Sequence, residues 1–158
     1  MIQRKQTVFL LLAAVAMALD FVFPIAEFVG SGNYQLTFYI YRVKSLVPDV
    51  AAPFDTMFVA PVTALTGLVI LGSLISVFLY KNRLMQAKLV RGLVIFTLGD
   101  VALIFFYNIP ALEKVTKTIA AYNYAGITMP LVALVMLILA INGIINDERL
   151  VRSADRLR

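Results

Sequence analysis

Four long apolar segments, separated by short charged loops, are the feature that most constrains this chain. They cover residues 7–29, 56–80, 92–112 and 126–145. Each is long enough to cross a hydrocarbon core about 30 Å thick, which takes about 20 residues of helix. Backbone groups inside lipid must pair within their own segment, so we expect helices rather than open strands. The pattern predicts an all-α integral membrane protein, one domain over residues 1–158 folded as an up-down-up-down four-helix bundle.

The composition supports a membrane protein and excludes several kinds of chemistry. Hydrophobic residues make up 61% of the chain and charged residues 15%, whereas a soluble domain of this size keeps a larger polar exterior. The absence of Cys and His removes zinc sites, iron–sulfur clusters, thiol nucleophiles and Ser-His-Asp triads. We find no phosphate-binding glycine loop and no cluster of metal ligands. The sequence therefore predicts a protein that is not an enzyme and that binds no metal and no cofactor.

The distribution of Lys and Arg predicts the orientation of the chain. If the N-terminus lies inside, the inner side carries the basic residues Arg4, Lys5, Lys81, Arg83, Lys88, Arg91, Arg149, Arg152, Arg156 and Arg158. The outer loops carry Arg42, Lys44, Lys114 and Lys117. Cytoplasmic loops are the ones enriched in Lys and Arg, so both termini are expected in the cytoplasm. The net charge of +5 then reflects orientation and not nucleic-acid binding.

The first segment has a second interpretation, as a cleaved secretory signal. Arg4 and Lys5 precede an apolar run that contains Ala-Val-Ala and Ala-Met-Ala, which resembles a cleavage site. The apolar run continues past Ala18 to Val29, however, and so reaches the length of a membrane span. Each segment also holds a proline. Pro24 and Pro110 lie near the C-terminal ends of their segments, where proline is expected to kink or terminate a helix.

The loop of residues 30–55 is the connection with most room for structure of its own. Residues 33–41 are rich in β-forming side chains and follow the turn signal Gly30-Ser31-Gly32. This pattern predicts a short strand or β-hairpin outside the cytoplasm, against the membrane surface. The tyrosines and phenylalanines of the loop could instead belong to the aromatic belt at the membrane interface.

Two carboxyl groups lie inside apolar segments. Gln6, Ala13 and Asp20 are one heptad apart on a small, polar helical stripe, so Asp20 should face the bundle interior. Asp100 is expected at a similar depth on the diagonally opposite helix. No Lys or Arg lies within a span, so protonation, hydrogen bonding or a bound cation must compensate each acid. The candidate hydrogen-bond partners are Thr63, Thr66, Ser73, Ser76, Thr97, Tyr107 and Asn142. The acids form either a proton or cation site, or a neutral contact that joins helices.

The C-terminal residues 147–158 are amphipathic if they are helical. Leu150, Val151, Ala154 and Leu157 share one face, and arginines dominate the other. This tail could lie on anionic lipid or bind a cytoplasmic partner. The alternative is a short, solvated extension of the last helix.

Three stretches of the sequence resemble a known family. They are Met1-Ile2-Gln3-Arg4-Lys5-Gln6-Thr7, Tyr80-Lys81-Asn82-Arg83 with Gln86, and Asp147-Glu148-Arg149-Leu150-Val151-Arg152-Ser153-Ala154-Asp155-Arg156-Leu157-Arg158. They are similar to those of a family of small four-helix membrane proteins that is found in Bacteroidota and carries a domain-of-unknown-function label. The resemblance implies a multipass protein of the bacterial inner membrane, and it implies no reaction, ligand or partner.

The functional prediction rests on these cytoplasmic segments. We expect them to form a polar surface that binds a partner protein or lipid headgroups through Arg4, Lys5, Lys81, Arg83, Gln86, Arg149, Arg152, Arg156 and Arg158. Gln3, Gln6 and Asn82 would add hydrogen-bonding groups beside these charges. The chain would then be an accessory or structural subunit of an inner-membrane assembly. The alternative is a small homo-oligomeric transporter, coupled to protons or cations through Asp20 and Asp100.

Overall fold

The computed structural model describes residues 5–29, 35–47 and 54–155, with the side chains described as far as residue 149. Within these ranges the helices are α1 (Lys5–Leu19), α2 (Thr56–Phe78), α3 (Arg83–Leu103), α4 (Ile109–Thr116) and α5 (Tyr124–Asp155). A short 3-10 helix η1 (Leu79–Lys81) follows α2, and a π-helix η2 (Ile104–Asn108) joins α3 to α4. The strands are β1 (Ala26–Phe28), β2 (Leu36–Tyr39), β3 (Arg42–Ser45) and β4 (Ala121–Tyr122).

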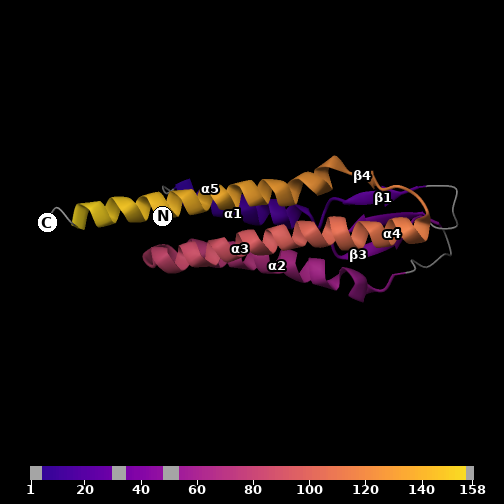
Figure 1. The fold of residues 1–158 in the computed structure, drawn as a ribbon, viewed down its shortest axis with the longest axis horizontal. Coiled ribbons are helices and arrows are strands. Elements are labelled where there is room, and N and C mark those ends of the chain that lie inside the picture. The colour runs from indigo at the N-terminus through magenta and orange to yellow at the C-terminus, as the bar shows by residue number, and fades with distance from the viewer. Residues whose placement is uncertain (1–4, 30–34, 48–53, 156–158) are drawn as a thin grey trace.

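The helices form four rods that pack along one long axis. Helices α1, α2 and α5 are three of these rods, and α3, η2 and α4 together form the other. α1 contacts α2 and α5, and α3 contacts the same two helices, so α1 and α3 occupy opposite corners. The core between them is apolar and includes Leu10, Met17 and Leu137. Figure 1 shows the start of α1 and the end of α5 at one end of the molecule and the strands at the other.

Three of the rods are long and apolar enough to cross a membrane: Thr56–Lys81, Arg83–Thr116 and Tyr124–Arg149. The fourth, α1, has 15 residues and is therefore only about 22 Å long. The prediction of one helix over residues 7–29 is thus wrong beyond Leu19. Pro24 has no amide hydrogen to donate to a helix, and the backbone after it pairs with other strands instead.

The strands form one antiparallel sheet in the order β3-β2-β1-β4. The hairpin of β2 and β3 lies within the loop for which the sequence predicts it, with Leu36 opposite Ser45 and Tyr39 opposite Arg42. The sheet is larger than predicted. β1 comes from the end of the first apolar segment, and β4 comes from the loop before α5.

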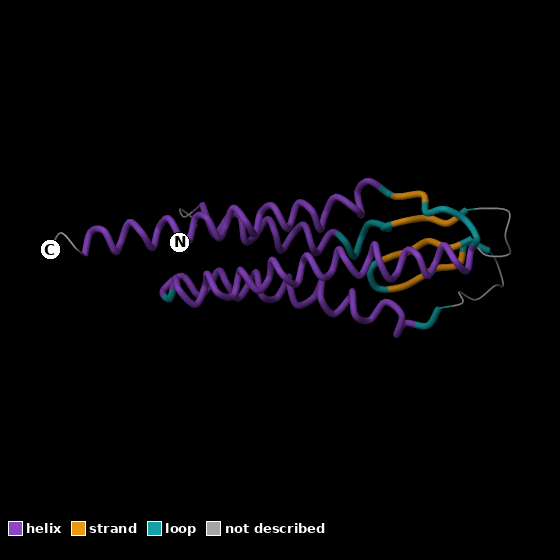
Figure 2. Tube along the Cα trace, in the orientation of Figure 1, coloured by secondary structure: helices purple, strands orange, loops and turns teal. Residues whose placement is uncertain are grey.

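The sheet takes the place of α1 beyond Leu19. Figure 2 shows the strands gathered at one end of the bundle, beside the helices. Phe28 and Phe38 are fully buried there, in a core that includes residues of α2, η2 and α4. The Thr63 hydroxyl of α2 donates a hydrogen bond of 2.6 Å to the Ile40 carbonyl between β2 and β3. Helix α2 and the sheet are therefore joined by apolar packing and by a hydrogen bond.

The third rod passes through Pro110 without ending there. It runs from Arg83 to Thr116, beyond the predicted residues 92–112, and the π-helix ends at Asn108, two residues before the proline. The Ile109 amide donates to the Ile104 carbonyl, five residues earlier. A π-helical insertion of this kind is one way in which a helix continues through a disturbed hydrogen-bond ladder. The rod ends at Lys117, whose φ of 55° is left-handed.

We predict that Gly126→Ala destabilises the protein. A Cβ at this position would fall on the Pro24 carbonyl oxygen, against backbone that cannot easily move. Overpacking of this kind costs about 1–3 kcal/mol, so the midpoint of thermal unfolding should fall when circular dichroism is followed in detergent. The matched control is Gly67→Ala, where a Cβ has no atom within 4 Å. An equal loss of stability in both variants would contradict the close approach of α5 to Pro24.

Candidate functional site

Strongly polar side chains are buried along the interior of the bundle. Each member of this buried polar set is at most 2% exposed: Gln6, Asp20, Thr66, Ser73, Ser76, Gln86, Thr97, Asp100 and Asn108. Burying a polar group costs free energy unless it finds a hydrogen-bond partner, and a buried charge costs more. The buried polar set therefore marks the part of the molecule where neighbouring helices must supply hydrogen-bond partners to polar side chains.

Asp20 and Asp100 are the two acids of this set. Asp20 directly follows the last residue of α1, and Asp100 lies near the end of α3, at the opposite corner of the bundle. Both side chains are 0% exposed. Their carboxyl groups lie within electrostatic range of each other. The two helices that do not pack side by side therefore bring their acids together across the bundle axis.

The Thr66 hydroxyl contacts both a backbone carbonyl and the carboxyl group of Asp100. The Thr66 hydroxyl oxygen lies 3.0 Å from the Val62 carbonyl oxygen and 3.2 Å from Oδ1 of Asp100. The hydroxyl donates toward both acceptors and shares its one proton between them. Oδ2 of Asp100 has no hydrogen-bond partner among the described residues. Full burial beside a single hydroxyl donor favours the neutral acid, because a buried charge costs more than a buried polar group.

The surroundings of Asp20 also favour the neutral form. Neither of its oxygens has a hydrogen-bond partner among the described residues. The residue lies at the C-terminal end of α1, where the carbonyl groups leave a partial negative charge that disfavours a carboxylate. A protonated carboxyl can donate to such carbonyls, whereas a carboxylate cannot.

Basic side chains are distant along the helices that hold the acids. Lys5 precedes Asp20 by fifteen residues, and Arg91 precedes Asp100 by nine, which is about 13 Å along a helix. Arg91 is exposed. Among the described residues no group of three or more His, Cys, Asp or Glu could hold a metal ion. The arrangement places two buried carboxyl groups near each other, a setting that favours a proton on each of them.

The predicted partners of the acids divide into two groups. Thr66 contacts Asp100, and Ser73 is fully buried but lies two helical turns from Thr66, about 10 Å along α2. Tyr107 is 54% exposed and its ring packs on Phe58, with ring centroids 5.6 Å apart. Asn142 is exposed as well. The placement of Tyr107 and Asn142 inside the bundle is therefore wrong.

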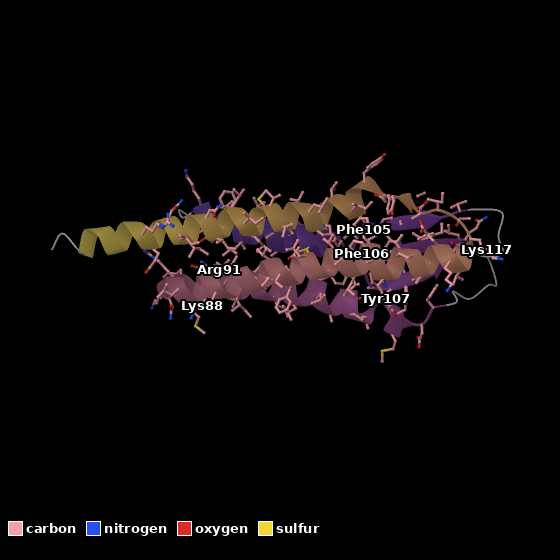
Figure 3. All side chains as sticks on the ribbon, in the orientation of Figure 1. Lys88, Arg91, Phe105, Phe106, Tyr107 and Lys117 are labelled. Atoms are coloured by element: carbon pink, nitrogen blue, oxygen red, sulfur yellow. The ribbon has the colours of Figure 1, made fainter. Side chains whose placement is uncertain are left out.

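The π-helix explains why Tyr107 points outward. Figure 3 labels this side chain on the helical segment that follows Asp100. On a regular helix residue 107 would share the face of Asp100, but wider turns between them shift the residues that follow. Asn108 takes the inward position instead, and its Nδ2 donates to the Phe58 carbonyl at 3.3 Å. On α5, Asn142 lies off the buried stripe that contains Leu137, Ala140 and Ile144.

Gln6 and Gln86 are buried, although both were predicted to contribute to the cytoplasmic surface; for Gln6, the stripe that it shares with Asp20 predicts burial. They are 2% and 1% exposed. Nε2 of Gln86 donates to the Ser76 carbonyl at 2.8 Å, and Gln6 packs against Gly143 of α5. The signal for their burial is in the sequence. Each glutamine precedes an acid of its own helix, Asp20 or Asp100, by fourteen residues, which is close to four helical turns.

The remaining predicted contact residues whose side chains the structure describes lie at the end of the bundle where α1 begins. Lys5, Lys81 and Arg149 are exposed. Arg83 is half-buried and donates from a guanidinium nitrogen to the Asp147 carbonyl at 2.9 Å. Arg152 lies in α5, and its side chain is outside the described part, as are residues Arg4, Arg156 and Arg158 altogether. Figure 3 places Lys88 and Arg91 at this end and Lys117 at the other.

Comparison with known proteins assigns the chain to a family. A family model described as a domain of unknown function, DUF4293, matches residues 2–157. The chain belongs to this family. Membership agrees with the resemblance to a domain-of-unknown-function family, and the bacterial group and the membrane location remain predictions. No curated protein is significantly similar to this DUF4293 chain.

We predict that the protein in lipid bilayers at neutral pH contains a protonated carboxyl group. Infrared spectra should contain the carbonyl stretch of a carboxylic acid, because ionisation would place a bare charge among apolar helices. The double variant Asp20→Asn, Asp100→Asn should lose this band. Asp55→Asn should keep it, since Asp55 is exposed and accepts a hydrogen bond from the Thr56 amide. A wild-type spectrum with carboxylate bands alone would contradict the neutral pair.

Proposed function

We propose that this DUF4293 protein is a non-enzymatic, multipass protein of the bacterial inner membrane that serves as an accessory or structural subunit of a membrane assembly. Three apolar helices with the length of a membrane span support the location. In this proposal both termini are cytoplasmic and the sheet faces the opposite side. The division of basic residues supports this orientation, since the end with the termini carries most of them.

The projection of α5 beyond the bundle is the observation that carries the proposal. This helix has 32 residues and is about 48 Å long. Figure 1 shows that its end continues past the neighbouring ends of α1, α2 and α3. In proteins most of the stability of a helix comes from packing against other elements, so a partner would stabilise turns that extend past the neighbouring helices. The projecting end of α5 therefore favours a binding partner over a solvated extension.

The direction of the projection favours a protein partner over a lipid surface. An amphipathic helix that binds lipid headgroups lies in the plane of the membrane. α5 instead continues along the long axis of the bundle, so that its end points away from the bilayer if the bundle crosses it. We infer that the partner contacts the last turns of α5, where Arg152 precedes the terminal residues Arg156 and Arg158.

A second candidate function is supported by the buried acid pair. Intramembrane carboxyl groups commonly belong to proton or ion pathways. Asp20 and Asp100, with Thr66 beside them, would supply the protonatable site of a small homo-oligomeric transporter coupled to protons or cations. The fully buried side chains around Phe28 and Phe38 lie between this site and the far end of the sheet. They would have to separate for a pathway to open there.

We predict that removal of residues 150–158 abolishes a stoichiometric interaction with a foreign protein. The tagged full-length chain, purified in gentle detergent from its own cells, should bring down this partner for identification by mass spectrometry. The truncated chain should insert and fold normally, because the bundle core that the structure describes, up to Ile144 of α5, is kept, and it should lose the partner. Asp20→Asn with Asp100→Asn is the matched control and should retain it.

Other outcomes of this experiment would contradict the subunit proposal. A full-length chain that purifies only as a homo-oligomer would support the transporter instead. That candidate requires proton or cation flux in proteoliposomes that the double Asp→Asn variant loses. Retention of the same partner by the truncated chain would show that α5 is not the binding element.

A further inference from the structure

We propose that a groove between the start of α3 and the end of α5 binds the phosphate of an anionic phospholipid. The groove has a volume of about 270 Å³. Its basic side chains are Arg83, Lys88, Arg91 and Arg149, and Glu148 is the acidic residue among them. The floor is apolar and consists of Leu84, Ala87, Ile144 and Ile145. This site is separate from the buried acid pair and from the projecting end of α5.

The charges of the groove are arranged for a phosphate. Lys88, Arg91 and Arg149 are exposed, so their cationic groups are accessible to a ligand. Arg83 is held between the two helices, because its guanidinium group donates to the Asp147 carbonyl at 2.9 Å. Guanidinium groups match the geometry of phosphate oxygens and can bind them through two hydrogen bonds. Arg91 and Lys88 of α3 line the groove together with Arg149 of α5, and Figure 3 labels the first two at this end of the molecule.

The apolar side chains beside the groove favour a phospholipid over a free anion. Along α3, the exposed residues Ile95 and Leu98 follow Arg91 by four and seven positions and so continue its face. Their side chains are 68% and 50% exposed. An acyl chain that runs from the groove toward the sheet would cover them. A free phosphate would contact only the basic side chains and would leave these apolar side chains uncovered.

The depth of the groove also suits a lipid headgroup. Arg83 to Arg91 occupy the first turns of α3, within about 12 Å of the end of the bundle. If the long helices cross the bilayer, this region lies at the level of the headgroups. Basic pockets between transmembrane helices on the cytoplasmic side are known to bind anionic headgroups. The proposal requires this membrane placement and does not depend on a protein partner.

Lipid titration of the purified, full-length protein tests the proposal. Native mass spectrometry would count bound molecules of short-chain phosphatidylglycerol, with phosphatidylcholine of the same chain length as the zwitterionic comparison. The test variant is Lys88→Gln with Arg91→Gln, two exposed side chains whose loss should not affect folding. The control is Lys5→Gln with Lys81→Gln, which removes the same charge at the same end but outside the groove.

We expect the wild type and the control to bind phosphatidylglycerol more tightly than phosphatidylcholine. The groove variant should bind it about tenfold more weakly, since each basic residue near anionic lipid contributes measurably to binding. An equal loss in the control would mean that the general charge of this end attracts the lipid, and would overturn the site. Equal binding of the two lipids would overturn it as well. If millimolar inorganic phosphate fully displaces the lipid, the groove binds a free anion and the proposal is overturned.

Discussion

The desolvation of two carboxyl groups is the constraint on which the arrangement of this bundle depends. Asp20 and Asp100 are fully buried, and the basic residues of their helices lie at the helix ends. Carboxyl groups in such surroundings must be neutral and must find hydrogen bonds inside the protein. The packing of α1 and α3 at opposite corners buries both acids within the bundle, where Thr66 of α2 donates a hydrogen bond to Asp100. The acids thereby fix the rotation of both helices.

Much of the helical framework follows from the apolar pattern of the sequence. Helix α2 begins at Thr56, as predicted, after Asp55 accepts a hydrogen bond from the first helical amide. The end of α1 was not predictable from hydropathy. Residues 20–29 are mostly apolar, which is compatible with either a helix or a strand. The pairing of β1 with β2 and β4 determines that part of this stretch forms a strand. Such pairing involves residues distant in the sequence, which a local pattern does not contain.

The residues of the candidate site were predictable on regular α-helix. They were misplaced where the α-helix changes to a π-helix. The heptad from Ala13 predicts that Asp20 faces inward, where it is fully buried. Thr66, one of the candidate partners, lies 3.2 Å from Oδ1 of Asp100. Tyr107 was misplaced because the π-helix changes the register after Asp100, and Asn108 lies inside instead. Gln86 was predicted to be a surface group because of its basic neighbours, although its spacing to Asp100 indicates burial. For Gln6, the stripe that it shares with Asp20 already indicated burial.

In the proposed orientation the bundle crosses the membrane with the start of α1 on one side and the sheet on the other. Because the chain has no native cysteine, single-cysteine variants report sidedness directly. Lys44→Cys in β3 and Lys81→Cys in η1 replace exposed residues at opposite ends. A membrane-impermeant maleimide should label Lys44→Cys in spheroplasts and should label Lys81→Cys only after permeabilisation. Labelling of both from the same side, or the reverse order, would contradict the account.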